Sequence, residues 1–193
     1  MKNVRIISKS AQLDLTIERL CYQLLEDYGD FKNTCLIGIQ TGGVALAERL
    51  QQKMAEILSE TKSRTSGVRG GIPLPLGKLD ITFYRDDFRT SKKPLAANTN
   101  DMPFVVENQR VILVDDVLYT GRSVQAAMTA LNHYGRPESV KLLVLVDRRF
   151  NRQVPVRPDY VGIVMDALDE AYVQVEWKEV EGSDRVLLFP HKD

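Results

Sequence analysis

Cysteine and histidine are scarce in this 193-residue sequence, which has only two of each. Cys21 and Cys35 lie in apolar segments and have no metal-ligand spacing, so neither a disulfide framework nor a cysteine-bound metal is expected. We expect both cysteines to be reduced core residues of a cytoplasmic protein.

The sequence also lacks an excess of charge and a long apolar run. Lys plus Arg and Asp plus Glu both number 26, so the whole chain has no basic excess of the kind typical of nucleic-acid binding. A local basic face remains compatible with this balance. Residues 1–5 contain no apolar run of a signal peptide, and no stretch is long enough to cross a membrane.

What is present is the apolar patterning of an ordinary globular protein. Helical spacing predicts three amphipathic helices, and short apolar runs predict strands buried on both faces. The helices cover 11–28, 46–57 and 124–134, and the buried runs are 35–39, 111–114 and 140–146. This alternation is typical of an α/β fold with a mostly parallel central sheet flanked by helices. We expect a single domain over residues 1–193.

The remaining segments are less regular. Leu79, Ile81 and Phe83 alternate with polar residues and predict a half-buried strand. Residues 60–77 predict an exposed loop, and the long polar stretch at about 85–103 predicts a functional lid. Short β-like runs predict a small C-terminal β flap over the edge of the sheet. These runs are 160–165, 172–177 and 186–189.

Two adjacent acids stand at the end of the strand that begins at residue 111. Asp115 and Asp116 can accept hydrogen bonds from vicinal hydroxyls such as those of a ribose, at the edge where parallel sheets bind ligands. Thr-Gly-Arg-Ser follows at 120–123 and opens a helix, whose free N–H groups suit a phosphate. An ordinary strand–turn–helix is the alternative, and the combination of both features favours a ribose 5-phosphate site.

The run 111–123, Val-Ile-Leu-Val-Asp-Asp-Val-Leu-Tyr-Thr-Gly-Arg-Ser, closely resembles the phosphoribosyl diphosphate (PRPP) motif of type I phosphoribosyltransferases. Together with Asp-Ile-Thr-Phe-Tyr-Arg-Asp-Asp at 80–87 and Val-Leu-Val-Asp-Arg at 144–148, it is similar to the PyrR family of pyrimidine-operon regulators with uracil phosphoribosyltransferase activity. The similarity runs from about residue 13 to 165.

The resemblance implies an enzyme that converts uracil and PRPP to UMP and diphosphate. It implies Mg²⁺ bound through PRPP and through Asp115 and Asp116, and a catalytic role for these two residues and Arg85. It also implies a homodimer or a larger homo-oligomer. The PRPP-binding residues would be Thr41, Gly42, Gly43, Asp115, Asp116, Tyr119, Thr120, Gly121, Arg122 and Ser123.

The loop at 41–43 follows a strand and opens a helix, so its N–H groups can face a diphosphate, although a plain turn is the alternative. Members of the resembled family often carry Arg where Gly42 stands. The positive charge would then come from Arg85, which opens the lid, or from Lys92 and Lys93.

The base pocket is predicted from later residues. Residues 157–162 resemble the base-binding flap of the fold class, where Tyr160 would stack on a base and the backbone of Val161 would pair with its edge. A core position is the equal alternative for Tyr160. Arg148 would reach a base carbonyl, or form a surface ion pair. Tyr119 stands where purine enzymes usually carry an Asp that serves N7, which favours a pyrimidine.

Two other functions stay open. One is a phosphoribosyltransferase for hypoxanthine, guanine, xanthine or orotate. The other is an RNA-binding attenuation regulator that senses UMP or PRPP with little catalysis, and binds a pyrimidine-operon mRNA leader. Residues 163–170 are acidic and argue against RNA, and we interpret the charges of 60–77 as solvated. The candidate RNA-binding residues are Lys62, Arg64, Arg69, Arg148, Arg149, Arg152 and Arg157.

Overall fold

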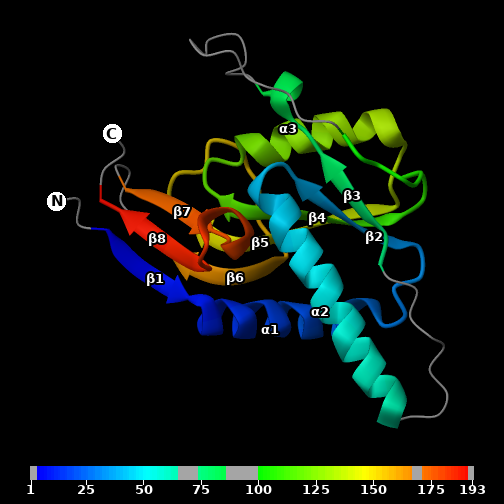
Figure 1. Cartoon of the computed structure of the whole chain (residues 1–193). Helices are drawn as coiled ribbons and strands as arrows, with labels where there is room; N and C mark the ends of the chain where they lie inside the picture. Colours follow the sequence, from blue (N-terminus) through cyan, green and yellow to red (C-terminus); the bar gives the residue numbers. More distant parts are fainter. Residues whose placement is uncertain (1–3, 65–73, 86–99, 167–170, 191–193) are drawn as a thin grey trace.

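A computed structural model describes residues 4–64, 74–85, 100–166 and 171–190 of the chain. Within these ranges, five parallel strands form a central sheet in the order β3-β2-β4-β5-β6 (Figure 1). The strands are β2 (Thr34–Ile39), β3 (Leu76–Leu79), β4 (Arg110–Leu118), β5 (Ser139–Arg148) and β6 (Tyr160–Met165). Because all five run in one direction, their carboxyl ends lie at one edge of the sheet.

Helices cover both faces of this sheet (Figure 1). Helices α1 (Ser10–Tyr28) and α2 (Gly42–Arg64) pack on the face that carries Ile112 and Val114 of β4. Helix α3 (Arg122–Leu131) packs on the face that carries Val111 and Leu113. Successive strand residues point to opposite faces, so two covered faces require the continuous apolar run seen in β4.

A second, antiparallel sheet joins the two ends of the described chain in the order β1-β8-β7. Its strands are β1 (Arg5–Lys9), β7 (Tyr172–Glu176) and β8 (Arg185–Phe189), and a short helix, α4 (Lys178–Glu181), connects the last two. The first and last strands lie side by side (Figure 1). Val173, Val175 and Trp177 join the buried cluster of α1 and α2, which fixes this sheet against the main domain.

The predicted fold class is confirmed, with two corrections in the strands. Residues 160–165 form the edge strand β6 of the main sheet and are not part of a flap. The flap is instead a three-stranded sheet that includes residues 5–9, which sequence reasoning missed.

The half-buried strand predicted from Leu79, Ile81 and Phe83 is wrong beyond Leu79. Strand β3 ends there, and a 3₁₀ turn, η1 (Thr82–Tyr84), follows. Asp80 accepts hydrogen bonds from the backbone N–H and the hydroxyl of Thr82, which gives the chain a local turn in place of a strand ladder. Helix α2 also continues to Arg64, into the segment predicted as a loop from residue 60. Of the helices in the described ranges, none is long and apolar enough to span a bilayer.

Candidate active site

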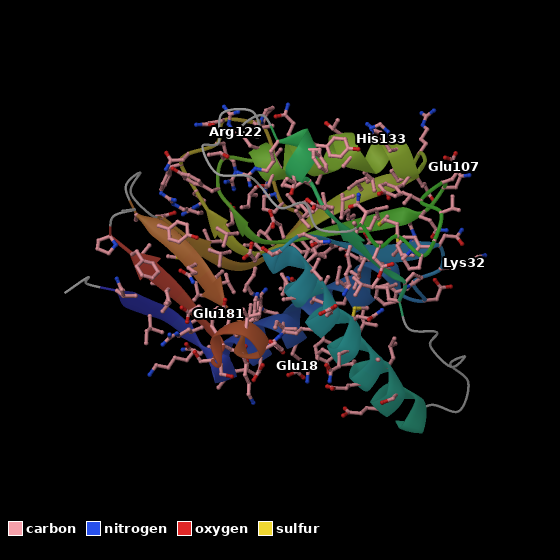
Figure 2. All side chains as sticks on the ribbon, turned by 45° about the horizontal axis from the view of Figure 1, so that its top comes forward. Glu18, Lys32, Glu107, Arg122, His133 and Glu181 are labelled. Atoms are coloured by element: carbon pink, nitrogen blue, oxygen red, sulfur yellow. The ribbon has the colours of Figure 1, made fainter. Side chains whose placement is uncertain are left out.

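A cleft of about 780 Å³ opens at the carboxyl edge of the main sheet. It lies where β4 passes into α3, and β7 of the small sheet forms part of its wall. Figure 2 labels Arg122, the first residue of α3, and His133, in the 3₁₀ turn η3 (Asn132–Tyr134) that follows α3, and the Arg122 end is the one at the cleft. The lining residues are Arg85, 115–124, Arg148 and 172–175.

The paired acids lie at the inner end of this cleft. Asp115 is buried, and its Oδ1 accepts the backbone N–H of Asp116 at 3.1 Å. Asp116 in turn accepts the N–H of Val117 at 2.8 Å. Burial raises the pKa of Asp115 well above its usual range, and the neighbouring Asp116 raises it further. Burial also raises the pKa of Asp116. A cation or a hydroxyl donor placed beside the pair would therefore stabilise its charged form.

The loop that follows β2 packs directly against this pair. A Cβ atom added to Gly42 would lie 2.0 Å from Oδ2 of Asp116, and one added to Gly43 would lie 2.3 Å from the carbonyl oxygen of Val114. The peptide bond between Gln40 and Thr41 is cis. Two segments that lie about seventy residues apart in the sequence are thus brought together, and only glycine allows so close an approach.

The turn from Tyr119 to Ser123 forms the next part of the lining. Gly121 is the N-cap of α3 with a φ of 89°, a left-handed conformation that favours glycine. Thr120 Oγ1 accepts the backbone N–H of Arg122 at 3.4 Å. The Arg122 side chain donates to Gln153 Oε1 at 2.5 Å. The amino end of α3, with its unsatisfied N–H groups, consequently opens on the cleft.

Arg148 lies at the cleft and is only 4% exposed. Its guanidinium carbon is 3.8 Å from the centre of the Tyr119 ring, in a cation–π contact. Of the two alternatives predicted for Arg148, a surface ion pair does not fit this burial. Arg85 also lines the cleft, and its positive charge lowers the pKa of Asp115 against the larger effects of burial and Asp116.

Tyr160 and Val161 are not brought to the cleft. Tyr160 is the first residue of β6, so it lies at the opposite edge of a parallel sheet from the carboxyl ends. Its hydroxyl donates to Asp27 Oδ2 at 2.5 Å and accepts from Lys141 Nζ at 3.2 Å. The carbonyl oxygen of Val161 accepts from Arg19 of α1. The geometry does not support a base-binding role for either residue.

Strand β7 supplies a wall of the cleft that sequence reasoning missed. Residues 172–175 line the cleft, whereas the sequence indicated only a short β-like run there. Val173 and Val175 point into the core, and Tyr172 and Gln174 occupy the alternate positions. This alternation was visible in the sequence, but the place of β7 depends on its pairing with β8.

The arginines of the β5–β6 loop are largely engaged within the protein. Arg149 pairs with Asp166 at 2.7 Å, and Arg152 pairs with Asp147. Arg157 is exposed. The side chains of Lys62 and Arg64, together with Arg69, Lys92, Lys93, the lid residues 86–99 and residues 167–170, lie outside the described part of the chain.

Comparisons with known proteins agree with this arrangement. Residues 4–179 match the model of the phosphoribosyl transferase domain. The chain is 40% identical over 188 residues to a bifunctional protein PyrR of Deinococcus radiodurans, covering 97% of this chain and 95% of that protein. It is 38% identical over 187 residues to a bifunctional protein PyrR of Halalkalibacterium halodurans, covering 95% and 96%.

Solved structures support the same fold. A hypoxanthine phosphoribosyltransferase of Staphylococcus aureus superposes with a TM-score of 0.66 at 18% identity, over 97% of this chain and 92% of that one. The hypoxanthine phosphoribosyltransferase of Trypanosoma cruzi gives a TM-score of 0.66 at 16% identity, over 97% of each chain. At this identity the likeness concerns the fold alone.

Proposed function

Because the chain belongs to the phosphoribosyl transferase family and, within it, to the PyrR family, we propose that it transfers the phosphoribosyl group of PRPP to uracil. The products are UMP and diphosphate. The observation that carries the proposal is that the Asp115–Asp116 pair and the amino end of α3 line one cleft, with the glycine loop packed against Asp116.

Each part of PRPP has a partner in this arrangement. The ribose hydroxyls donate to Asp115 and Asp116, and the 5-phosphate accepts from the turn at 119–123. The diphosphate lies between the loop at 41–43 and Arg85. The charge of Arg85 compensates for the absence of a cationic side chain at Gly42.

The acid pair also fits Mg²⁺. Carboxylate oxygens are the ligands that this ion prefers, and Mg²⁺ usually binds through one or two carboxylates, several waters and substrate phosphates. Among the described residues, no group of three or more His, Cys, Asp or Glu side chains could hold a metal by itself. Asp115 and Asp116 would therefore hold the ion together with PRPP. Bound there, it would neutralise charge on the diphosphate.

The protein's own residues act by orientation and electrostatics. The bond from C1 to the diphosphate breaks as positive charge develops on the ribose. N1 of uracil forms the new bond to C1, and the proton that N1 loses passes to the departing diphosphate. Asp115 and Asp116 orient the ribose and favour its positive charge, and Arg85 stabilises the departing diphosphate. No nucleophile from the protein is needed.

The uracil lies between the Tyr119–Arg148 stack and β7. Arg148 offers N–H donors for a uracil carbonyl, and Gln174 of β7 offers an amide for the base edge. Tyr119 presents no carboxylate for a purine N7, which favours a pyrimidine. This assignment replaces Tyr160 and Val161 with residues that line the cleft.

A panel of bases tests this function. Purified protein is supplied with Mg²⁺, PRPP and one base from uracil, hypoxanthine, guanine, xanthine and orotate, and diphosphate release is measured. We expect release above the no-enzyme control with uracil, and a sharp loss of turnover in Asp116→Asn. If none of the bases gives diphosphate release above the no-enzyme control, the enzymatic proposal is contradicted. Unchanged turnover in Asp116→Asn would remove this residue from the ribose site.

We also propose a regulatory function on pyrimidine-operon mRNA, since the relatives are named bifunctional proteins. The opposing observation is that Arg148 is buried and that Arg149 and Arg152 are paired with acids, which leaves few free cations in this loop. Filter binding of a pyrimidine leader RNA over a salt series tests the proposal. RNA retention that falls as salt rises supports the proposal. The absence of RNA retention at low salt would exclude an RNA-binding regulator, whether or not the protein is also an active enzyme.

A further inference from the structure

Arg152, in the loop between β5 and β6, binds the outer side of the turn that follows β4. Its guanidinium Nη1 donates to the main-chain carbonyl oxygens of Leu118, at 3.3 Å, and of Tyr119. The same nitrogen donates to the carbonyl of Arg148 at 3.0 Å. One side chain thus joins the backbone of both members of the Tyr119–Arg148 stack.

The two residues after Arg152 extend this attachment. The backbone N–H groups of Gln153 and Val154 both donate to the carbonyl of Thr120, at 2.9 and 3.1 Å. Residues 152–154 therefore bind three consecutive carbonyls, those of residues 118–120. The turn is held along its whole outer side by a segment that follows it by about thirty residues.

Fixing these carbonyls also fixes the N–H groups of the same peptide units. In a trans peptide the C=O and N–H bonds point in opposite directions, and the only cis bond in the described residues is Gln40–Thr41. The N–H groups of Tyr119, Thr120 and Gly121 are thus directed away from residues 152–154, and these three residues line the cleft. Successive N–H groups at a helix amino end form an anion site.

Arg152 is itself held in place by a counter-charge. Its Nη2 donates to Asp147, the penultimate residue of β5, and its Nε donates to the carbonyl of Val156 at 3.3 Å. The Arg152 side chain is only 22% exposed. The loop also contains Phe150 at a φ of 82°, a backbone conformation that a bulky residue adopts only when its surroundings require it.

From these contacts we infer that Arg152 is a positioning residue for the 5-phosphate of PRPP. It touches no substrate atom and acts by holding the turn 118–120 so that its N–H groups face the phosphate. The inference rests on the proposed function, because the anion concerned is the 5-phosphate of that substrate. It gives a physical role to Asp147 in the Val-Leu-Val-Asp-Arg motif as well.

Arg149 provides a matched control within the same loop. Its side chain is 50% exposed and pairs with Asp166, which is 52% exposed, so its loss removes the same charge without touching the turn. The variants are Arg152→Gln, Arg152→Lys and Arg149→Gln. The Lys variant keeps the charge but lacks the fork of donors, and it provides a milder change should the Gln variant fail to fold.

The experiment compares binding of PRPP, ribose 5-phosphate and diphosphate, each with Mg²⁺, by calorimetry, and adds KM and kcat for PRPP. We expect Arg152→Gln to weaken ribose 5-phosphate and PRPP by about tenfold or more, with a smaller effect from Arg152→Lys. Diphosphate binding should stay within about twofold, and KM should change more than kcat, because the 5-phosphate is remote from the bond that breaks.

Three results would overturn the inference. The first is that the Arg152 variants bind ribose 5-phosphate as well as Arg149→Gln does. The second is that ribose 5-phosphate and diphosphate weaken equally, which would indicate a general loss of structure. The third is that the unaltered protein binds neither PRPP nor ribose 5-phosphate, and this result alone would also contradict the proposed function.

Discussion

The guanidinium carbon of Arg148 lies 3.8 Å from the centre of the Tyr119 ring, so that a buried cation covers an aromatic ring at the wall of the cleft. The two residues come from the ends of neighbouring strands, β5 and β4. A cation placed on the ring restricts the space for a base and offers N–H donors at its edge.

Removing the ring at position 119 should weaken uracil use. A cation–π contact at a site with little water contributes about 1–2 kcal/mol, so Tyr119→Leu should lower kcat/KM for uracil by about tenfold. Tyr119→Phe keeps the ring and should lose less. Steady-state kinetics with saturating PRPP measure both variants. Equal losses in the two variants would show that the hydroxyl, and not the stack with Arg148, is what matters.

Asp115→Asn should make the protein more stable and less active. Burial and Asp116 raise the pKa of Asp115 in the folded protein above its unfolded value of about 3.9. The free energy of unfolding is therefore highest below the unfolded pKa, where Asp115 is neutral, and it falls as pH rises through the folded pKa. At neutral pH the Asn variant should gain about 1 kcal/mol, and the gain should shrink toward pH 4. Urea unfolding over a pH series measures it, and a less stable variant at neutral pH would refute the prediction.

Gly42→Ala should damage the site without unfolding the protein. The added Cβ would lie 2.0 Å from Oδ2 of Asp116, so either the carboxylate or the loop must move. A displacement of about 1 Å in a catalytic arrangement costs up to about 100-fold in rate, and we expect kcat/KM for PRPP to fall by about 10- to 100-fold. An unchanged unfolding midpoint is the control. Unchanged kinetics would mean that the loop does not need its approach to Asp116.

Tyr160→Phe should affect stability and leave uracil kinetics unchanged. It removes the hydrogen bond to Asp27, which should cost about 1 kcal/mol of unfolding free energy. The bonds from Tyr160 and Lys141 lower the pKa of Asp27, so their stabilisation is present above the usual Asp pKa and is lost as pH falls. Urea unfolding, repeated as pH falls, tests the loss of stability. Uracil kinetics on the same preparation test whether activity is unchanged. A lower kcat/KM for uracil would indicate that Tyr160 contributes to base binding after all.

The sequence predicts the Asp115–Ser123 side of the cleft because that side is local. Asp115, Asp116 and the turn to Ser123 form one strand–turn–helix, and the order of residues alone places them at the edge of a parallel sheet. The approach of Gly42 to Asp116 follows from the same rule, since β2 and β4 are neighbours in the sheet.

The opposite side of the cleft could not be predicted in the same way. Tyr160 follows a suggestive local pattern, but a position at the start of a parallel strand faces the opposite edge. The wall from β7 depends on β8, and β8 in turn pairs with β1 from the other end of the described chain, which no local period encodes. Arg152 has the composition of a solvated loop cation, and only the fold shows that its acceptors are carbonyls more than thirty residues earlier.

The order of the small sheet has a consequence for how the molecule is made. Strand β7 reaches β1 only through β8, so its wall of the cleft cannot be secured until residues near both ends of the described chain have met. Within the described residues the five-stranded sheet takes no strand from beyond residue 165, so its pairing does not depend on the small sheet. We therefore expect the wall from β7 to form after the rest of the cleft, once β8 has paired with β1.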